Sequence, residues 1–199
     1  MRWNERFSSE DYLFGTDPNS FLAAQKHLLK PGKQALAIAD GEGRNGVWMA
    51  EQGLEVLSVD FSPVGQNKAR QLACARGVML KTILADIETW EWEPRRFDVV
   101  AAIFIQFANS ELRETIFRGI CWTLVPGGLL LLQGYRPEQL KYKTGGPSCA
   151  ENMYTAHLLR NAFATFEILN LEVHDSLMVE GNGHGGMSAL IDFVARKPV

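Results

Sequence analysis

The sequence predicts an α/β fold whose doubly wound, mostly parallel sheet has seven strands and ends in an antiparallel hairpin. Two observations lead to this prediction. Between residues 34 and 135, short apolar segments alternate with helical segments, as they do when parallel strands are joined by right-handed crossovers. Near the end of the chain, two strand-like segments follow one another with no helix between them, so we expect them to pair antiparallel.

The first five strands are expected at residues 34–39, 54–59, 78–84, 97–105 and 128–135. The fourth is a continuous apolar run, which indicates a strand covered on both faces. Helices are expected after the first, second and fourth strands. The first follows the glycine-rich loop and ends at about Gln52, the second begins at Pro63 and ends at Gly77, and the third spans residues 110–124. Apolar spacing and the flanking Ser, Pro and Gly residues indicate these helices.

The two ends of the chain differ from this alternating pattern. Residues 1–16 are aromatic-rich and irregular, and Asp17 and Pro18 then read as the cap and first position of a helix. After a Gly-, Pro- and Lys-rich insertion at residues 136–154, a short helix and the last two strands are expected, at residues 155–163, 166–175 and 187–196. Asn170 breaks the alternation of the sixth strand and indicates a β-bulge.

Composition is typical of one soluble globular domain over residues 1–199. We expect a monomer or a homodimer. Hydrophobic residues make up 46% of the chain and charged residues 22%, and the net charge of −3 gives no reason to expect a nucleic-acid partner. The three cysteines are scattered and odd in number, which favours a reducing, cytoplasmic location. No apolar run is long enough to suggest a membrane span, and the polar first residues do not resemble a signal peptide.

The segment ADGEGRNG, residues 39–46, contains the glycine spacing of a nucleotide-binding loop. Two carboxylates, Asp40 and Glu42, lie inside this loop. A pyrophosphate prefers backbone N–H donors without a nearby anion, whereas S-adenosylmethionine (SAM) carries a cationic sulfonium and ammonium. The carboxylates therefore favour SAM, by about 1 kcal/mol for each close, partly exposed pair. Arg44 could bind a phosphate, so an NAD(P)-dependent oxidoreductase remains an alternative.

Candidate binding residues also follow the other strands, because an open α/β sheet binds ligands beyond the carboxyl ends of its strands. Asp60 comes 17 positions after Gly43, the usual distance for a carboxylate that binds ribose hydroxyls. After the third strand, Asp86 is expected at the adenine amino group and Ile87 against the ring.

The order of the elements, together with DGEGRN, the upstream YLFGTDPNSFL and the downstream PGGLLLL, resembles a class I SAM-dependent methyltransferase across nearly the whole chain. The resemblance is to the small-molecule branch that contains tellurite-resistance and thiopurine methyltransferases. The first loop of that family commonly reads acidic-x-Gly-x-Gly-x-Gly. Here Ala37 replaces the acid and Ala39 the first glycine, so Asp40 or a backbone carbonyl is expected to bind the methionine ammonium instead.

The resemblance implies a Rossmann-like sheet, SAM as the cofactor, S-adenosylhomocysteine as its product, and a small-molecule acceptor such as a thiol or a metalloid oxyanion. Methyl transfer is an in-line displacement on an already activated methyl group, so the protein's main task is alignment and the exclusion of water. The sequence shows no evident general base and no metal-ligand spacing. Because of Ala37 and Ala39, a non-catalytic methyltransferase-like binding domain is a further alternative.

The candidate site residues fall into two groups. The cofactor contacts are expected in the arm, the glycine loop and the strand ends: Tyr12, Gly15, Asp40, Gly41, Glu42, Gly43, Asn45, Asp60, Phe61, Asp86, Ile87 and Ile103. The substrate contacts are expected at Gln106, Phe107, Tyr142 and His184. Residues 1–32 are expected to act as a lid, or else merely to pack against the first helix. The basic residues of the 136–154 insertion are expected either to attract the acceptor or to lie in a solvated loop.

Overall fold

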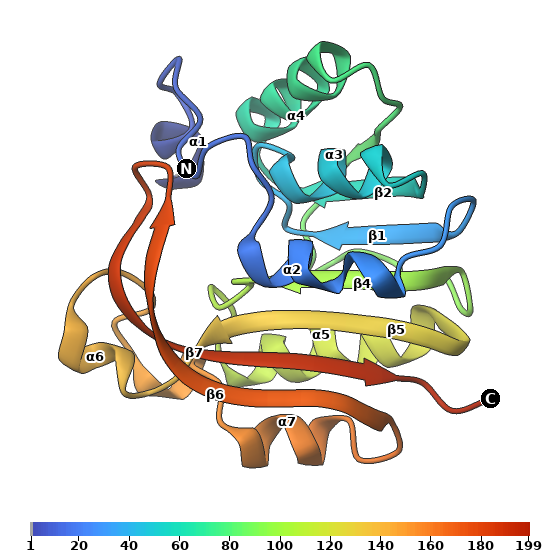
Figure 1. The fold of residues 1–199 in the computed structure, drawn as a ribbon, viewed down its shortest axis with the longest axis vertical. Coiled ribbons are helices and arrows are strands. Elements are labelled where there is room, and N and C mark those ends of the chain that lie inside the picture. Colours follow the sequence, from blue (N-terminus) through green and yellow to red (C-terminus); the bar gives the residue numbers. More distant parts are fainter. Residues whose placement is uncertain (1) are drawn as a thin grey trace.

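A mixed seven-stranded sheet runs through the computed structural model, which describes residues 2–199 (Figure 1). Its strands are β1 (Gln34–Ile38), β2 (Glu55–Asp60), β3 (Lys81–Leu84), β4 (Phe97–Ile103), β5 (Leu124–Tyr135), β6 (Glu167–Glu180) and β7 (His184–Arg196). The strand order is β3-β2-β1-β4-β5-β7-β6. The first five strands pair in parallel, whereas β7 is antiparallel to both β5 and β6. The predicted fold class is therefore confirmed.

Helices cover both faces of the sheet. They are α1 (Arg2–Arg6), α2 (Ser20–Ala24), α3 (Arg44–Glu51), α4 (Pro63–Ala75), α5 (Ser110–Thr123), α6 (Gln139–Tyr142) and α7 (Ala156–Ala162). Two short 3₁₀ turns span Gln25–Leu28 and Ala150–Asn152. Apolar side chains of α5 and α7 pack on one face, and those of α2 and α3 pack on the other. Helix α4 packs beside α3 and over β3.

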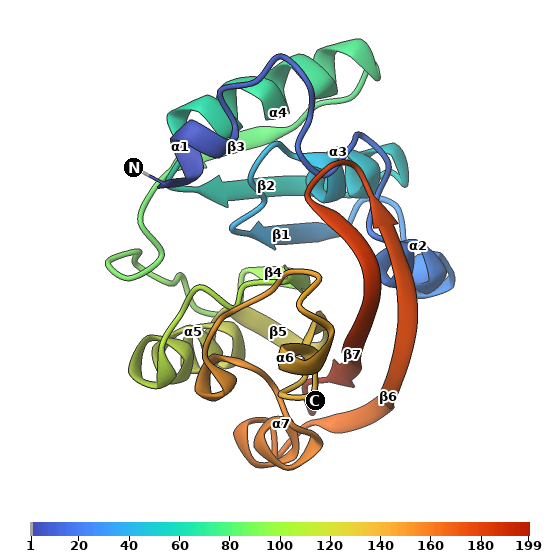
Figure 2. The ribbon, with the colours of Figure 1, turned by 90° about the vertical axis from the view of Figure 1, so that its left-hand side faces the viewer.

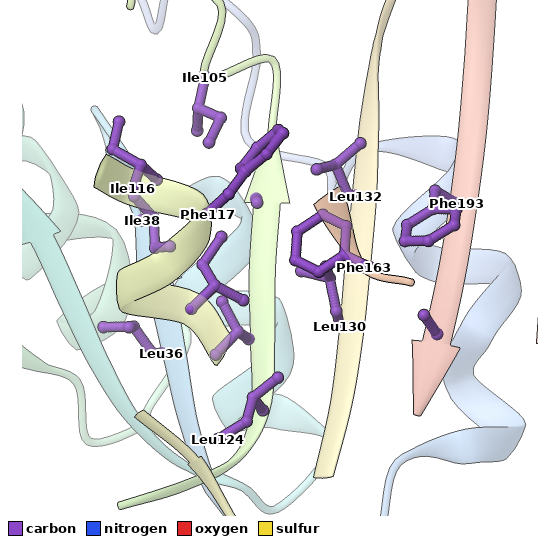
Figure 3. Close-up of a cluster of buried hydrophobic side chains, with 14 of the residues drawn as sticks. Leu36, Ile38, Ile105, Ile116, Phe117, Leu124, Leu130, Leu132, Phe163 and Phe193 are labelled. Carbon is purple, nitrogen blue, oxygen red and sulfur yellow. The ribbon is translucent and has the colours of Figure 1, made fainter. Parts of the chain in front are cut away.

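The larger core lies between the sheet and α5 with α7 (Figure 3). Phe117 of α5 and Phe163, which follows α7, have ring centroids 5.0 Å apart, and Phe163 lies 5.6 Å from Phe193 of β7. Leu130 and Leu132 of β5 face this core, whereas the residue between them, Leu131, faces the other. Alternate residues of one strand thus enter two cores, which explains why the central strands read as continuous apolar runs.

Several local features differ from the sequence-based expectation. Strand β3 begins at Lys81 instead of residue 78, and β5 begins at Leu124 instead of residue 128. Helix α2 begins at Ser20 instead of Pro18, because Oδ1 of Asn19, not Asp17, accepts the backbone N–H of Leu22 at 3.0 Å. The insertion contains the short helix α6. The final hairpin is longer than expected and turns at residues 181–183, so His184 begins β7 instead of lying in the loop. A register shift between Ile168 and Asn170 confirms the irregularity expected in β6.

The tip of the β6–β7 hairpin curves away from the sheet toward the N-terminal arm, residues 2–16 (Figure 2). The backbone N–H of Gly183 donates to the carbonyl of Leu13 at 2.7 Å. A Cβ at Gly181 would lie only 2.4 Å from the backbone nitrogen of Gly15, so arm and hairpin touch closely. The N-terminal arm and the tip of the final hairpin therefore meet above the carboxyl edge of the central strands.

Candidate functional site

A pocket with an empty volume of about 690 Å³ lies at the carboxyl ends of β1, β2 and β4, under the N-terminal arm and the hairpin. The site expected for an open α/β sheet is at this edge, beside the first strand. The lining residues come from the arm, three strand ends and the start of β7: Trp3, Phe7, Phe14, Ala39, Asp40, Gly41, Arg44, Asn45, Asp60, Phe61, Ile103, Phe104, Phe107 and His184.

The loop between β1 and α3 forms the floor of the pocket through left-handed backbone conformations. Gly43 caps α3 with φ +86°, and a Cβ there would lie 2.5 Å from the Cβ of Ala69 in α4. Gly43 therefore lets two helices approach each other. Ala39 has φ +49°, a region that glycine occupies easily and other residues rarely do. The backbone thus keeps a glycine-like turn at the position where the resembling family has glycine.

Asp60, at the end of β2, joins two loops at the pocket floor. Its Oδ2 accepts the backbone N–H of Gly41 and its Oδ1 that of Ser62, both at 2.8 Å. The residue is only 6% exposed. Burial raises the pKa of this carboxyl, although the hydrogen bonds from Ser62, Gly41 and Phe61 act against the rise. Each oxygen keeps acceptor capacity beyond its one bond to the protein.

Asp40 also lines the pocket, and its carboxyl group reaches beneath the first turn of α3. Oδ1 accepts the backbone N–H of Gly46 at 3.2 Å, while Oδ2 is buried without a hydrogen-bond partner in the described chain. A Cβ on Gly46 would lie 2.3 Å from this Oδ2, so the third glycine of the loop makes room for the carboxyl group. Burial is the main reason that the pKa of Asp40 is raised to about 7.

Two other charged side chains of this loop are neutralised by partners. Oε1 of Glu42 lies 2.5 Å from Nζ of Lys68 on α4, and Glu42 is absent from the lining of the pocket. Arg44 does line the pocket, but its Nη2 lies 2.6 Å from Oε2 of Glu180, and both side chains are buried. The negative charge expected from Glu42 therefore lies outside the pocket, and the positive charge of Arg44 is paired.

His184 forms part of the pocket wall, where it is surrounded by rings. Its ring centroid lies 4.5 Å from Phe14, 4.6 Å from Phe104 and 6.0 Å from Tyr135. Nδ1 lies 3.2 Å from Oε2 of Glu180. The histidine thus connects the pocket to the buried pair of Arg44 and Glu180.

The structure brings eight of the expected site residues together around the pocket: Asp40, Gly41, Asn45, Asp60, Phe61, Ile103, Phe107 and His184. It places the other eight elsewhere: Tyr12, Gly15, Glu42, Gly43, Asp86, Ile87, Gln106 and Tyr142.

Each of these eight has a different environment. The Tyr12 hydroxyl donates to the carbonyl of Lys68, and Gly15 meets the hairpin. Asp86 caps its own turn by accepting the backbone N–H of Glu88, while the Ile87 side chain joins the larger core. Gln106 exchanges hydrogen bonds with the backbone of Tyr135, and the Tyr142 hydroxyl donates to Asp175 on β6. Glu42 and Gly43 face α4.

Six lining residues were not among the expected site residues: Trp3, Phe7, Phe14, Ala39, Arg44 and Phe104. The aromatic composition of the first 16 residues was a usable signal for the first three, because a polar, exposed arm has little reason to carry so many rings. Phe104 has φ +53°, which the sequence does not reveal.

Within residues 2–199, no three His, Cys, Asp or Glu side chains are grouped so that they could hold a metal ion. None of the helices in that range combines the length and apolar character that a membrane crossing requires.

Comparisons with known proteins agree with this architecture. Residues 35–128 match the family described as a methyltransferase domain. A demethylmenaquinone methyltransferase of Thermus thermophilus is 31% identical over 112 residues, which cover 55% of this chain and 50% of that protein. The matched region thus spans about half the length of this relative.

Two solved structures show the same fold. TehB from Haemophilus influenzae superposes with a TM-score of 0.75 at 16% identity, covering 98% of this chain and 65% of TehB. The N-methyltransferase NodS from Bradyrhizobium japonicum, solved with S-adenosyl-L-homocysteine, gives a TM-score of 0.72 at 13% identity, covering 100% of this chain and 97% of NodS. Sequence match and fold together lead to one conclusion: residues 35–128 are similar to a methyltransferase domain, and the chain shares the fold of TehB and NodS.

Proposed function

We propose that this protein binds SAM in the pocket at the carboxyl edge of the sheet and catalyses transfer of its methyl group to a small-molecule acceptor. The observation that carries the proposal is the position of Asp60. Its carboxylate ends β2, fixes the backbone of Gly41 and lines the pocket. A buried carboxylate at this place is suited to accept the two hydroxyl groups of a ribose.

The charges around the pocket fit a cationic nucleoside better than a dinucleotide. Asp40 and Asp60 both line the cavity, and the cation that lines it with them, Arg44, is paired with Glu180. A pyrophosphate would meet carboxyl groups at the loop where it needs N–H donors. Phe7 and Phe61 supply apolar walls for an adenine ring. NodS, which shares the fold, was solved with S-adenosyl-L-homocysteine, and this supports the same ligand class here.

SAM would supply a methyl group that is already activated by a cationic sulfonium. The chain's own residues therefore mainly align the acceptor with this methyl group and shield both from water. Ile103 ends β4, Phe104 and Phe107 follow it, and all three line the pocket. Together with Phe14 of the arm, they exclude water and confine an acceptor. The arm is held in place by buried contacts and thus serves as a lid over the cofactor.

The acceptor is a small molecule, and the candidates are thiols, metalloid oxyanions and comparable nucleophiles. The pocket lies beneath the arm and the hairpin, and this cover supports a compact acceptor rather than a polymer. The relative from Thermus thermophilus is named for a small-molecule acceptor, demethylmenaquinone, which supports this class in general terms.

Titration calorimetry with SAM, S-adenosylhomocysteine and NAD tests the cofactor, because the proposal expects heat from the first two and none from NAD. Binding of NAD in place of SAM would instead indicate an oxidoreductase. Methyl-labelled SAM, incubated with a panel of thiols, phenols and metalloid oxyanions, then tests catalysis. SAM binding without label transfer to any acceptor would indicate a non-catalytic binding domain.

A further inference from the structure

His184 is a histidine in an unusually apolar setting. It begins β7, lines the pocket, and its side chain is 12% exposed. Rings of Phe14, Phe104 and Tyr135 surround it. A side chain with two polar nitrogens is costly in such a place unless both nitrogens are used.

The contact with Glu180 determines which nitrogen carries the proton. Glu180 is buried on β6, where Oε2 contacts Arg44 and His184 and Oε1 accepts from Asn19 at 3.0 Å. Burial alone would raise the pKa of Glu180, but His184 and Arg44 outweigh it and hold the pKa at about 2. An ionised carboxylate only accepts hydrogen bonds, so Nδ1 of His184 must donate.

In the neutral imidazole, Nε2 is then the nitrogen that carries the lone pair. In the part of the chain that the structure describes, no hydrogen bond involves Nε2 of His184. Because His184 lines the pocket and Nδ1 is occupied by Glu180, Nε2 is the nitrogen available to a bound molecule. A carboxylate that fixes the tautomer and orientation of an imidazole is the arrangement that general bases use.

Strained backbone next to His184 is a second, independent sign of function. Phe104 has φ +53°, a genuine outlier for a bulky aromatic residue. The conformation is held by a hydrogen bond from its N–H to the carbonyl of Gln133 at 2.9 Å. It places the ring in the pocket, 4.6 Å from the His184 ring. Strain of this kind persists where it positions a side chain at a site.

We infer that Nε2 of His184 is the general base for methyl transfer to a planar acceptor that carries a protonated hydroxyl, such as a phenol or an enol, and that Glu180 is its positioning residue. This inference rests on the proposed function. As the lone pair of the acceptor oxygen forms the bond to the methyl carbon, the methyl–sulfur bond breaks and its electron pair stays on sulfur. The acceptor proton passes to Nε2 and later to solvent.

The surroundings of His184 favour this acceptor class over an inorganic oxyanion. Phe14, Phe104 and Phe107 offer flat apolar surfaces on which an aromatic ring can stack. An oxyanion needs a cation, yet the positive charge of Arg44 is already paired with Glu180. An acceptor that enters as an anion would also have no proton for the base to remove.

The inference is tested without turnover by 4-nitrophenol, whose ionised form absorbs visible light. The protein is loaded with S-adenosylhomocysteine and titrated with the phenol at a pH where free 4-nitrophenol is mostly protonated. Wild type should bind it and increase its ionised fraction, because the proton moves to Nε2. In His184→Gln the ionised fraction of the bound phenol should be at least about tenfold lower, which corresponds to a pKa difference of about one unit, because the amide cannot take up the proton.

The other charged and titratable groups near His184 are the same in both proteins: Glu180 of β6, Arg44 of α3, Tyr135 of β5, and Asp40 and Asp60 across the pocket. His157→Gln, on the exposed side of α7, is the matched control and should behave as wild type. Calorimetry with S-adenosylhomocysteine distinguishes a failure of the proposed function from a failure of the inference about His184. Equal binding to wild type and His184→Gln shows that the variant is folded and the cofactor site intact.

Failure of S-adenosylhomocysteine to bind wild type would refute the proposed function itself. If it binds, but 4-nitrophenol does not bind or ionises equally in wild type and His184→Gln, the inference about His184 is overturned while the cofactor site stands. Turnover gives a further check. With acceptor phenols of graded acidity, the loss in His184→Gln should be about 100-fold for weakly acidic phenols and should shrink for those already ionised.

Discussion

Nζ of Lys68 and Oε1 of Glu42 lie 2.5 Å apart beneath the N-terminal arm, and both side chains are buried. The same Nζ lies 2.9 Å from the carbonyl oxygen of Ser9 and 2.7 Å from that of Asp11. Oε2 of Glu42 accepts the backbone N–H of Leu13 at 2.8 Å. One ion pair therefore ties the glycine loop and α4 to the segment that covers the pocket.

Lys68→Met should loosen the arm and destabilise the fold. The substitution keeps an apolar stem of similar length but leaves Glu42 buried and uncompensated, and removing one partner of a buried pair costs about 3 to 5 kcal/mol. We expect faster hydrogen exchange over residues 7–13 and a lower free energy of unfolding in a denaturant titration. SAM affinity should fall as well, because Phe7 and Phe14 of the arm line the pocket.

Arg70→Met is the matched control for this experiment, since Arg70 lies on the exposed side of the same helix and donates only to the Thr82 hydroxyl among the described residues. Its exchange rates in the arm should equal those of wild type. If Lys68→Met left the exchange of residues 7–13 unchanged, the ion pair would not be what holds the arm.

Asp60→Asn should weaken SAM binding by about 1 to 3 kcal/mol, the cost of leaving buried hydrogen-bonding groups without their partner. An amide has one acceptor oxygen, so it cannot hold the N–H groups of Gly41 and Ser62 and also accept two ribose hydroxyls. Calorimetry with SAM measures the change directly.

Asp98→Asn provides the comparison, because Asp98 also accepts a backbone N–H, that of Gln34 at 3.0 Å, but at the amino end of β4. It should lose some stability and bind SAM as wild type does. Undiminished SAM affinity in Asp60→Asn would mean that the ribose lies elsewhere.

The succession of strands along the chain could be predicted from the sequence because each central strand is marked locally. Leu130 to Leu132 form an uninterrupted apolar run that only a strand between two cores explains. Helix starts were predictable where the capping residue is unambiguous, as at Ser62, whose side chain accepts the N–H of Gly65. The α2 start was wrong because Asp17 and Asn19 are both good caps and only the fold selects between them.

The pocket was predictable where a residue's role follows from its place at a strand end, as for Asp60 and Ile103. It was not predictable where contacts join distant parts of the chain. Glu42 was expected to face the cofactor, but its side chain turns to Lys68 on the next helix. Arg44 was the residue that kept the NAD(P) alternative open, because it could bind a phosphate, but Glu180 of the final hairpin neutralises it. No local pattern in the sequence marks either pair.

Asp40→Asn should change how stability depends on pH. An aspartate ordinarily ionises near pH 3.8, whereas burial raises the pKa of Asp40 to about 7 in the folded protein. Between these values the folded state keeps a proton that the unfolded chain has lost, so the free energy of unfolding falls as the pH rises through this window. From pH 5 to pH 8, the free energy of unfolding should fall by about 2 to 3 kcal/mol more for wild type than for Asp40→Asn.

Denaturant titrations of both proteins at several pH values measure this difference, and the other carboxyl groups cancel in the comparison. The side-chain amide that replaces the Asp40 carboxyl group can still accept the N–H of Gly46 through its oxygen, so the helix start should remain. Parallel pH profiles for the two proteins would show that Asp40 ionises normally in the folded state.

Substitutions at Ala39 test the strained turn at the end of β1. At φ +49°, a side chain costs about 1 to 2 kcal/mol that glycine does not, although glycine is more disordered in the unfolded chain by about 0.5 to 1 kcal/mol. Ala39→Gly should therefore leave the free energy of unfolding unchanged or raise it by up to about 1 kcal/mol. Ala39→Val should lower it, because a β-branched side chain tolerates this region worst. Ala35→Gly, at a buried position within β1, should instead destabilise the protein. A denaturant titration measures these changes. If Ala39→Gly lowered the free energy of unfolding as much as Ala35→Gly does, the turn at Ala39 would carry no strain.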